Sequence, residues 1–132
     1  NNARKTVDRI IDVFPAEQQA QARTMLAGSL RGVVAQLLMK RCDKPGRVAV
    51  NEILFATPAV AAIIREGATQ KLADVITGGK GMGMQFMDDA IWDKLVQGLV
   101  SPEEAYMKAI DKNRFKNFLP PESAALANAG GA

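Results

Sequence analysis

Apolar residues in the first thirty positions of this chain recur at the spacing of an amphipathic α-helix. The first set stands at positions i, i+3, i+4 and i+7 and consists of Val7, Ile10, Ile11 and Phe14. Pro15 ends this helix and opens the next, because proline fits the first turn of a helix but not its interior. The second helix is lined by Ala22, Met25, Leu26 and Leu30. Two amphipathic helices are therefore predicted here.

The pattern changes at residues 33–39, an apolar run that fits either a strand or a helix by period alone. Pro45 and Gly46 follow in the order that the two central positions of a type II turn require. Beyond this turn the residues alternate, with one side formed by Val48, Val50 and Glu52 and the other by Ala49, Asn51 and Ile53. A turn followed by an alternating segment predicts a β-hairpin.

Two helices are predicted after the hairpin, each with a recognisable start. Thr57 is an N-cap residue, and Pro58 takes the first helical position, so a helix covers residues 59–65 and ends at Gly67. Thr69 caps a further helix that runs to about Thr77. Four glycines then break the helical pattern and allow a sharp turn of the backbone: Gly78, Gly79, Gly81 and Gly83.

A longer amphipathic helix is predicted over residues 84–99. Its apolar stripe consists of Met84, Met87, Ile91, Leu95 and Leu99, widened by Trp92 and Val96. Its polar side carries Asp88, Asp89, Asp93 and Lys94. The residues that follow, Ser101-Pro102-Glu103-Glu104, form a capping box with proline at the first helical position, so a last helix is expected to start there.

Composition is typical of one globular domain, with 48% hydrophobic and 23% charged residues in a chain of 132. No apolar run is long enough to cross a bilayer, and no signal peptide is visible. The start without methionine suggests a fragment of a longer protein. The net charge is +3, the basic residues are dispersed and aromatic residues make up 5%, which favours a solvated surface over a nucleic-acid-binding one.

Motifs for phosphate and metal chemistry are missing from the sequence. The nearest string to a phosphate-binding loop is Gly78-Gly79-Lys80-Gly81, in which glycine follows the lysine and a helix, not a strand, precedes it. The glycines at 79, 81 and 83 fail as a dinucleotide fingerprint for the same reason. One cysteine, Cys42, and no histidine cannot form a structural zinc site within one chain. We therefore expect neither a metal nor a nucleotide site in this segment alone.

Several motifs nevertheless stand in a familiar order. The segment from Ala3 to Lys40, the string GRVAVNEIL from Gly46 to Leu54, and Gly83-Met84-Gln85 resemble the C-terminal region of the type IV pilus retraction ATPases. These PilT-type twitching motors belong to the type II and type IV secretion ATPases. The resemblance covers residues 1–119 and leaves 120–132 as an expected flexible tail. It implies an α+β, mostly helical segment with a β-hairpin, taken from a RecA-like ATPase domain after its histidine box.

The resemblance also implies the setting of the parent protein. Such a motor is a homo-hexamer that uses ATP and Mg²⁺, lies in the cytoplasm at the inner membrane and acts on a membrane platform protein of the pilus base. Direct membrane insertion and nucleic-acid binding are not expected. Because Walker A, Walker B and the histidine box all precede this region in the family, the segment should be inactive alone. In place of the four-cysteine zinc module of many type II secretion ATPases, this chain has only residues 42–46.

One candidate functional element is the helix that aligns with the box associated with retraction in this family, called here the retraction box. It consists of Ala59, Val60, Ala61, Ala62, Ile63, Ile64 and Arg65. The box departs from the family pattern, because Ala61 stands where the family has arginine and Ala62 where it has asparagine. Arg65 alone keeps a charge. The competing interpretation is that the apolar residues of the box simply pack.

Two smaller sets complete the candidate residues. Gly83, Met84 and Gln85 are interpreted as a hinge and helix cap, in which glycine permits the turn, methionine packs and glutamine bonds backbone near the helix start. A second set consists of Arg31, Gln36 and Glu52. A charged side chain on an apolar strand needs a partner, so Arg31 and Glu52 are expected to pair. Alternatively, Arg31 faces a phosphate or a neighbouring subunit.

Two other functions remain open at the level of sequence. One is a small helical interaction module without a motor parent. The other is the equivalent segment of a pilus assembly ATPase or a type II secretion ATPase, because these residues do not indicate whether the motor retracts or assembles a pilus.

Overall fold

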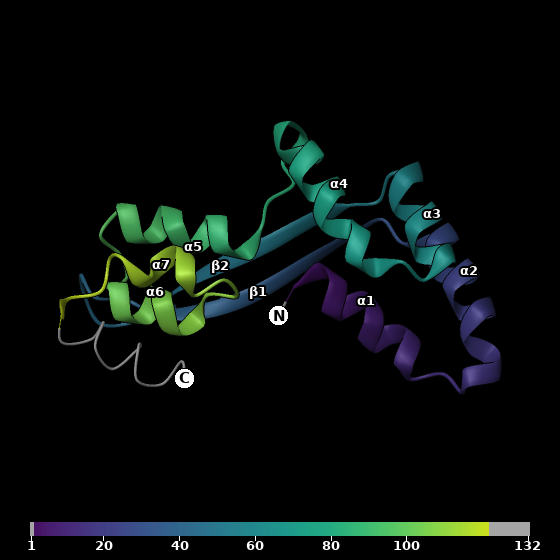
Figure 1. The fold of residues 1–132 in the computed structure, drawn as a ribbon, viewed down its shortest axis with the longest axis horizontal. Helices are drawn as coiled ribbons and strands as arrows, with labels where there is room; N and C mark the ends of the chain where they lie inside the picture. Colours follow the sequence, from purple (N-terminus) through teal and green to yellow (C-terminus); the bar gives the residue numbers. More distant parts are fainter. Residues whose placement is uncertain (1, 122–132) are drawn as a thin grey trace. The chain divides into compact units, whose positions relative to one another are not determined.

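The computed structural model describes residues 2–121 (Figure 1), which fold into helices and one antiparallel hairpin. The elements are α1 (Ala3–Asp12), α2 (Gln19–Ser29), β1 (Gly32–Lys40), β2 (Arg47–Phe55), α3 (Pro58–Glu66), α4 (Leu72–Gly79), α5 (Met87–Val96), α6 (Pro102–Lys108) and α7 (Asn113–Lys116). Short 3₁₀ turns cover Ala16–Gln18, Thr69–Lys71 and Lys80–Met82. The predicted mostly helical α+β class is confirmed. The expected tail beyond residue 121 lies outside the described residues.

The hairpin register is set by backbone hydrogen bonds at its two ends. Arg41 N donates to Gly46 O at 3.0 Å, and Ala56 N donates to Arg31 O at 3.0 Å. The buried residues of the strands alternate and are Val33, Ala35, Met39, Val50, Glu52 and Leu54. The predicted hairpin is confirmed, and Gly46 in its loop has φ 120°, a conformation that favours glycine. The apolar run at 33–39 is a strand because it pairs with β2, which its own period could not reveal.

The chain divides into two compact units, each built from two separate stretches. The first unit contains residues 2–36 and 51–86, and the second contains residues 37–50 and 87–121 of the described chain. Both strands are shared: the open end of the hairpin belongs to the first unit and its turn end to the second.

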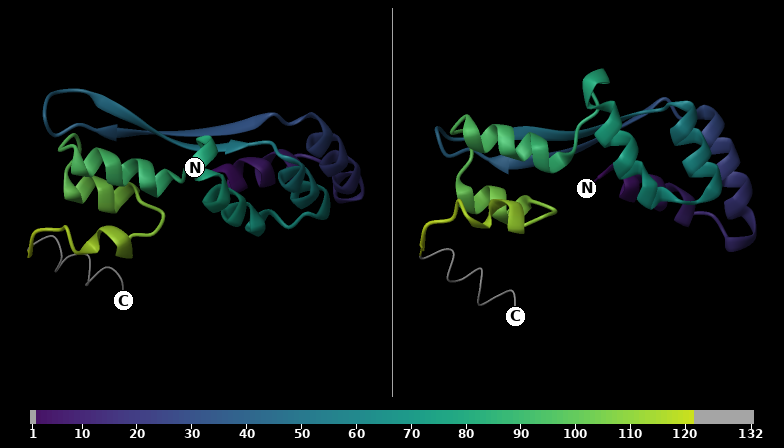
Figure 2. Two further views of the ribbon diagram at one scale, coloured as in Figure 1. Left: turned by 90° about the horizontal axis from the view of Figure 1, so that it is seen from above. Right: turned by 45° about the horizontal axis from the view of Figure 1, so that its top comes forward.

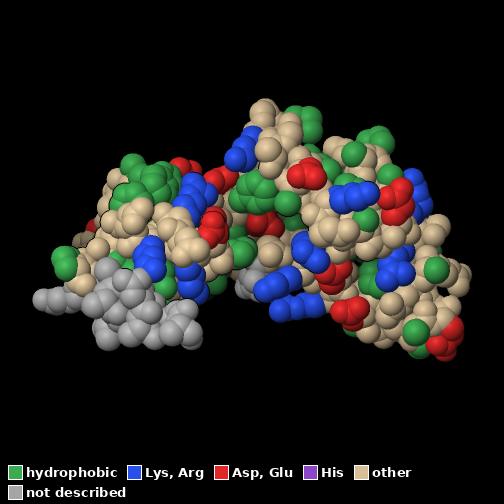
Figure 3. All heavy atoms as spheres, in the orientation of Figure 1, with side chains coloured by type: hydrophobic (Ala, Val, Ile, Leu, Met, Phe, Trp, Pro, Cys, Tyr) green, Lys and Arg blue, Asp and Glu red, His purple; other side chains and the backbone are tan. Residues whose placement is uncertain are grey.

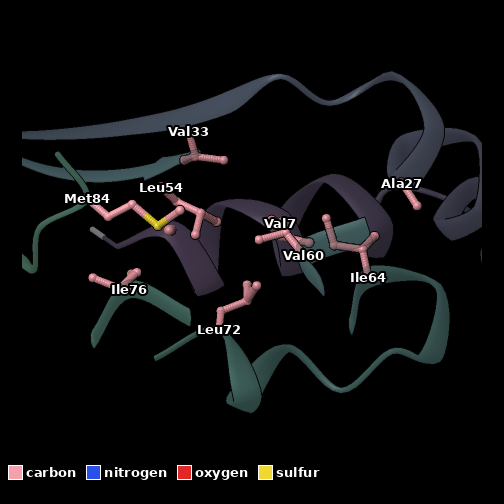
Figure 4. Close-up of a cluster of buried hydrophobic side chains, with 10 residues drawn as sticks. Val7, Ala27, Val33, Leu54, Val60, Ile64, Leu72, Ile76 and Met84 are labelled. Carbon is pink, nitrogen blue, oxygen red and sulfur yellow. The ribbon is translucent and has the colours of Figure 1, made fainter. Parts of the chain in front are cut away.

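The core of the first unit is one cluster drawn from α1 to α4, both strands and Met84 (Figure 4). Its buried members are Ala3, Val7, Ala27, Val33, Leu54, Val60, Ile64, Leu72, Ile76 and Met84. Helices α2 and α3 lie side by side in this unit (Figures 1 and 2). The predicted faces of the first two helices are only partly buried. Ile10 and Phe14 are each 41% exposed, because α1 turns only Ala3, Val7 and Ile11 inward and ends before Phe14. On α2 the buried residues are Ala22 and Ala27, and Met25 is 67% exposed.

The second unit is built around α5, which is shorter than the predicted helix over residues 84–99. It begins at Met87, because the residues just before it pair with β2 instead of continuing a helix. It ends at Val96, close to Gly98 with its φ of 75°. Met87 and Ile91 are buried as predicted, whereas Leu95 and Leu99 are only half-buried and Val96 is 70% exposed. The predicted stripe is therefore right in its first half and wrong at Val96.

The helix starts read from the sequence are largely confirmed. Thr57 Oγ1 accepts a hydrogen bond from Val60 N at 3.3 Å, and Ser101 Oγ accepts one from Glu104 N at 3.1 Å. Both helices carry proline in their first turn. Thr69 is different, because its hydroxyl donates to Asp8 of α1 at 2.8 Å instead of capping α4.

Candidate functional site

The retraction box occupies almost the whole of α3 and has two different sides. Val60 and Ile64 are 0% and 1% exposed and lie in the core of the first unit, where Figure 4 shows them in one cluster with Val7 and Leu72. Ala61 and Ile63 are half-buried against the same cluster, and Ala62 is also half-buried. Ala59 and Arg65 are exposed. The apolar residues of the box pack as the competing interpretation expects, and the exposed charge of Arg65 remains for other contacts.

The C-terminal end of α3 lies beside two arginines. The helix closes with Ala68 N donating to Ile63 O and Gly67 N donating to Ile64 O, both at 3.1 Å. Arg65 lies in the last turn, where the helix dipole favours a cation. Arg23 of α2 lies against the same end, since a Cβ on Gly67 would be 3.2 Å from its Nε atom. Glu66, the last residue of α3, is also exposed here, so this end of the box carries charges of both signs.

Gly83, Met84 and Gln85 tie the end of α4 to β2. Gly83 has φ 100°, a conformation that other residues rarely adopt, and it turns the chain back after α4. Met84 is 2% exposed and donates its backbone N–H to Gly79 O at 3.1 Å. Gln85 exchanges two backbone hydrogen bonds with Ile53 at 2.9 and 3.0 Å, and its Nε2 donates to Asn51 O at 2.7 Å. Gln85 thus bonds β2, where the sequence suggested the start of the following helix.

The close approach of Met84 to Gly79 can be tested by alanine substitutions at two adjacent glycines, which should change stability in opposite directions. A Cβ on Gly79 would collide with the Met84 side chain, whereas a Cβ on Gly78 would meet no atom within 4 Å. We expect Gly79→Ala to destabilise the protein by about 1–3 kcal/mol, because the buried Met84 must move. Gly78→Ala should stabilise it by about 0.5–1 kcal/mol, the ordinary helix preference for alanine. Urea denaturation measures both, and equal effects would contradict the packing described.

The third predicted set is separated in the structure. Arg31 and Gln36 are exposed, and Arg31 lies opposite Ala56, just after the end of β2 and four residues from Glu52. Glu52 is 4% exposed, and its Oε2 accepts a hydrogen bond from Ala3 N, the first residue of α1, at 2.6 Å. The pairing of Arg31 with Glu52 stays a prediction. The sequence analysis missed the contact with α1. The available signal was that α1 has no acidic residue in its own first turn, where a negative charge is favoured.

Acidic residues of α5 have structural partners that the sequence placed only on a polar surface. The two oxygens of Asp88 accept hydrogen bonds from Ile110 N at 2.9 Å and Asp111 N at 2.8 Å. Asp89 pairs with Arg114 Nη1 at 2.7 Å, and that guanidinium lies 5.2 Å from the centre of the Trp92 ring. These contacts fasten the turn between α6 and α7, and α7 itself, to α5.

The hairpin turn carries an ion pair between Arg41 and Asp43, with N–O distances of 2.6 and 2.8 Å. This pairing lowers the pKa of the Asp43 carboxyl to about 2 from an ordinary 3.8, with the hydrogen bond from Arg41 as the main cause. The pair therefore contributes to stability above about pH 4, and this contribution is lost as the pH falls toward 2.

Over the face shown in Figure 3, basic and acidic side chains are interspersed.

Residues 2–121 contain no group of three or more Cys, Asp or Glu side chains placed to hold a metal ion. None of the described helices is long and apolar enough to cross a membrane. An open hollow of about 190 Å³ lies on the first unit and is lined by Phe14, Gln18, Gln21, Ala22 and Met25.

Comparison with known proteins gives consistent matches, although no protein-family profile matches the chain. It is 47% identical over 107 residues to a twitching motility protein of Neisseria gonorrhoeae, covering 81% of this chain and 29% of that protein. It is 43% identical over 108 residues to the type IV pilus retraction ATPase PilT of Pseudomonas aeruginosa, covering 82% and 31%. The crystal structure of the pilus retraction motor PilT with bound ADP superposes with a TM-score of 0.73 at 32% identity, covering 86% and 31%. The chain thus spans less than a third of the length of these relatives.

Proposed function

Because the chain is homologous to the C-terminal region of the type IV pilus retraction ATPases, we propose that it is the C-terminal segment of a hexameric ATPase that powers pilus retraction. The parent motor binds and hydrolyses ATP with Mg²⁺ in the cytoplasm and pulls on a platform protein of the inner membrane. This segment supplies contacts between subunits and couples nucleotide turnover to movement. Its own residues include no phosphate-binding loop, so the chemistry belongs to the rest of the parent.

The observation that carries this proposal is the joint match in sequence and structure. Sequence identity of 43% to PilT extends over 82% of this chain, and the retraction motor with bound ADP has the same fold over 86% of it. The PilT structure also shows that such a motor binds ADP, which supports ATP as the substrate of the parent.

The arrangement of α3 supports a coupling role for the retraction box. Its apolar side shares one core with Leu54 of β2 and Met84, so we expect α3 to move together with the open end of the hairpin and the turn after α4. Its exposed end presents Arg65 to the surroundings. Because the helix is held firmly by its core, it does not bend when it is displaced. A cation at its exposed end can therefore pass that displacement to a neighbouring subunit. We therefore assign the coupling contact of the box to Arg65.

Replacing Arg65 with alanine in the full-length motor tests this assignment. We expect retraction and retraction-coupled ATP hydrolysis to fall by on the order of tenfold, the effect of losing about 1.4 kcal/mol at the decisive contact. Stability should change by no more than about 0.5 kcal/mol, because the side chain is exposed. Twitching, ATPase rate and thermal unfolding are measured on the same variant.

Arg9→Ala is the matched control, because Arg9 is also an exposed arginine in the last turn of a helix of the first unit. It should leave both motility and stability unchanged. Normal twitching of Arg65→Ala would reduce the box to a packing element. An equal loss in Arg9→Ala would show that the effect comes from surface charge in general.

A further inference from the structure

Glu52 is the one charged side chain that is buried among the residues described. It extends from β2, and its Oε2 accepts a hydrogen bond of 2.6 Å from Ala3 N, 49 residues earlier in the sequence. Ala3 is the first residue of α1 and is itself 0% exposed in the core of the first unit. A strand in the middle of the sequence therefore holds the very start of the first helix.

The chemistry of this contact makes it a strong one. The first N–H groups of a helix have no partner within the helix, and its N-terminus attracts negative charge. Asn2 caps only the N–H of Lys5, at 2.8 Å, and α1 has no acidic residue in its own first turn. Glu52 supplies the missing acceptor and the missing charge together, and a hydrogen bond to a carboxylate is stronger than one to a neutral acceptor.

A second contact holds α1 farther along. Asp8 Oδ1 accepts a hydrogen bond from the Thr69 hydroxyl at 2.8 Å, and Thr69 is 8% exposed. The two contacts are different in kind. The Thr69 contact fixes the middle of α1 against the turn before α4, whereas the Glu52 contact fixes the end of α1 at which the preceding polypeptide enters.

We infer that Glu52 is a positioning residue of the motor: it holds the first turn of α1 on β2 and so fixes the point at which the preceding part of the parent chain joins this segment. The inference rests on the proposed function, in which the nucleotide-binding part of the motor precedes α1. A shift at this joint misplaces that part relative to the hairpin and α3. A residue that acts only through the position of α1 should, when lost, lower kcat and leave the KM for ATP unchanged.

The experiment compares three variants of the full-length motor. Glu52→Ala removes the acceptor, and we expect kcat for ATP hydrolysis to fall by on the order of tenfold to a hundredfold, the effect of small misplacements in active sites. Glu52→Gln keeps an oxygen that can accept from Ala3 N, so it should recover most of kcat. Thr69→Val removes the second contact of α1 and should lower the melting temperature while kcat stays unchanged.

The outcomes separate positioning from mere stability. The inference is overturned if kcat is unchanged in Glu52→Ala. It is also overturned if Thr69→Val loses kcat in proportion to its own loss of stability, because kcat would then follow stability alone. Should Glu52→Ala fail to fold, Glu52→Gln decides: low kcat at an unchanged melting temperature contradicts an anchor that acts through the hydrogen bond, and near-normal kcat supports it.

Hydrogen exchange distinguishes failure of this inference from failure of the proposed function. A wild-type full-length protein without Mg²⁺-dependent ATP hydrolysis counts against the proposed function. In that event the amide of Ala3 in the 132-residue chain is followed instead. Faster exchange in Glu52→Ala than in Thr69→Val supports the anchor, and equal exchange overturns it.

Discussion

Replacing Phe115 with alanine should lower the free energy of unfolding of the second unit by about 3–5 kcal/mol. Phe115 is 0% exposed and is the buried residue of α7, a helix of only four residues that cannot persist without packing. Its ring centre lies 6.0 Å from that of Trp92 on α5, and Arg114 lies over both rings. The loss of this ring removes the main apolar contact that holds α7 in place.

Phe118→Ala is the matched control for this prediction. Its ring also meets Trp92, edge to face at 4.9 Å, but the residue is 44% exposed, so we expect a loss of about 0.5–1.5 kcal/mol. Trp92 is the one tryptophan of the chain, which makes its fluorescence in urea a direct probe of the second unit. Equal losses for the two phenylalanines would show that α7 does not pack as described.

Ile64→Ala should destabilise the first unit by about 2–5 kcal/mol, the usual cost of truncating a buried isoleucine to alanine. Ile64 is 1% exposed and belongs to the cluster that joins α3 to α1 and β2. The cavity it leaves lies between several elements, so none of them can close it alone. Circular dichroism at 222 nm during urea denaturation measures the loss, because most of this unit is helical.

Ile10→Ala provides the comparison for Ile64→Ala. Ile10 is 41% exposed on α1, and its replacement should change stability by no more than about 0.5 kcal/mol. A second comparison, of Ile64→Ala with Arg65→Ala, separates the two sides of the retraction box. Ile64→Ala should act through stability and Arg65→Ala through motility, and a variant of Ile64 with unchanged stability would remove the packing role assigned to α3.

The features predicted correctly from the sequence have local causes. The hairpin turn depends on Pro45 and Gly46, and the starts of α3 and α6 depend on Thr57 and Ser101 with the prolines that follow them. Each signal acts within four residues, so the sequence around it contains the whole cause. The resemblance to retraction ATPases was likewise visible in the order of short motifs, and the comparisons confirm it.

The features that were missed depend on contacts between distant residues. Gln85 leaves the helical pattern because it pairs with Ile53, and Glu52 bonds Ala3 across 49 residues. Periodicity could not show which apolar residues of α1 face inward, since Ile10 and Ile11 fit the same stripe and only Ile11 is buried. The retraction box could be located by its position in the sequence, but only packing separates its buried residues from Arg65.

The sharing of the hairpin between two units has a consequence for the gene. Each unit combines an early and a late stretch of sequence, residues 2–36 with 51–86 and residues 37–50 with 87–121. A single recombination crossover between two homologous genes, at any codon in this region, therefore leaves at least one unit with parts from both parents. Even a crossover between codons 86 and 87 joins the hairpin turn of one parent to α5, α6 and α7 of the other. Recombination events that transfer codons 2–121 as one block should therefore be tolerated best. Chimeric proteins that exchange this region intact should fold more often than those with a crossover inside it.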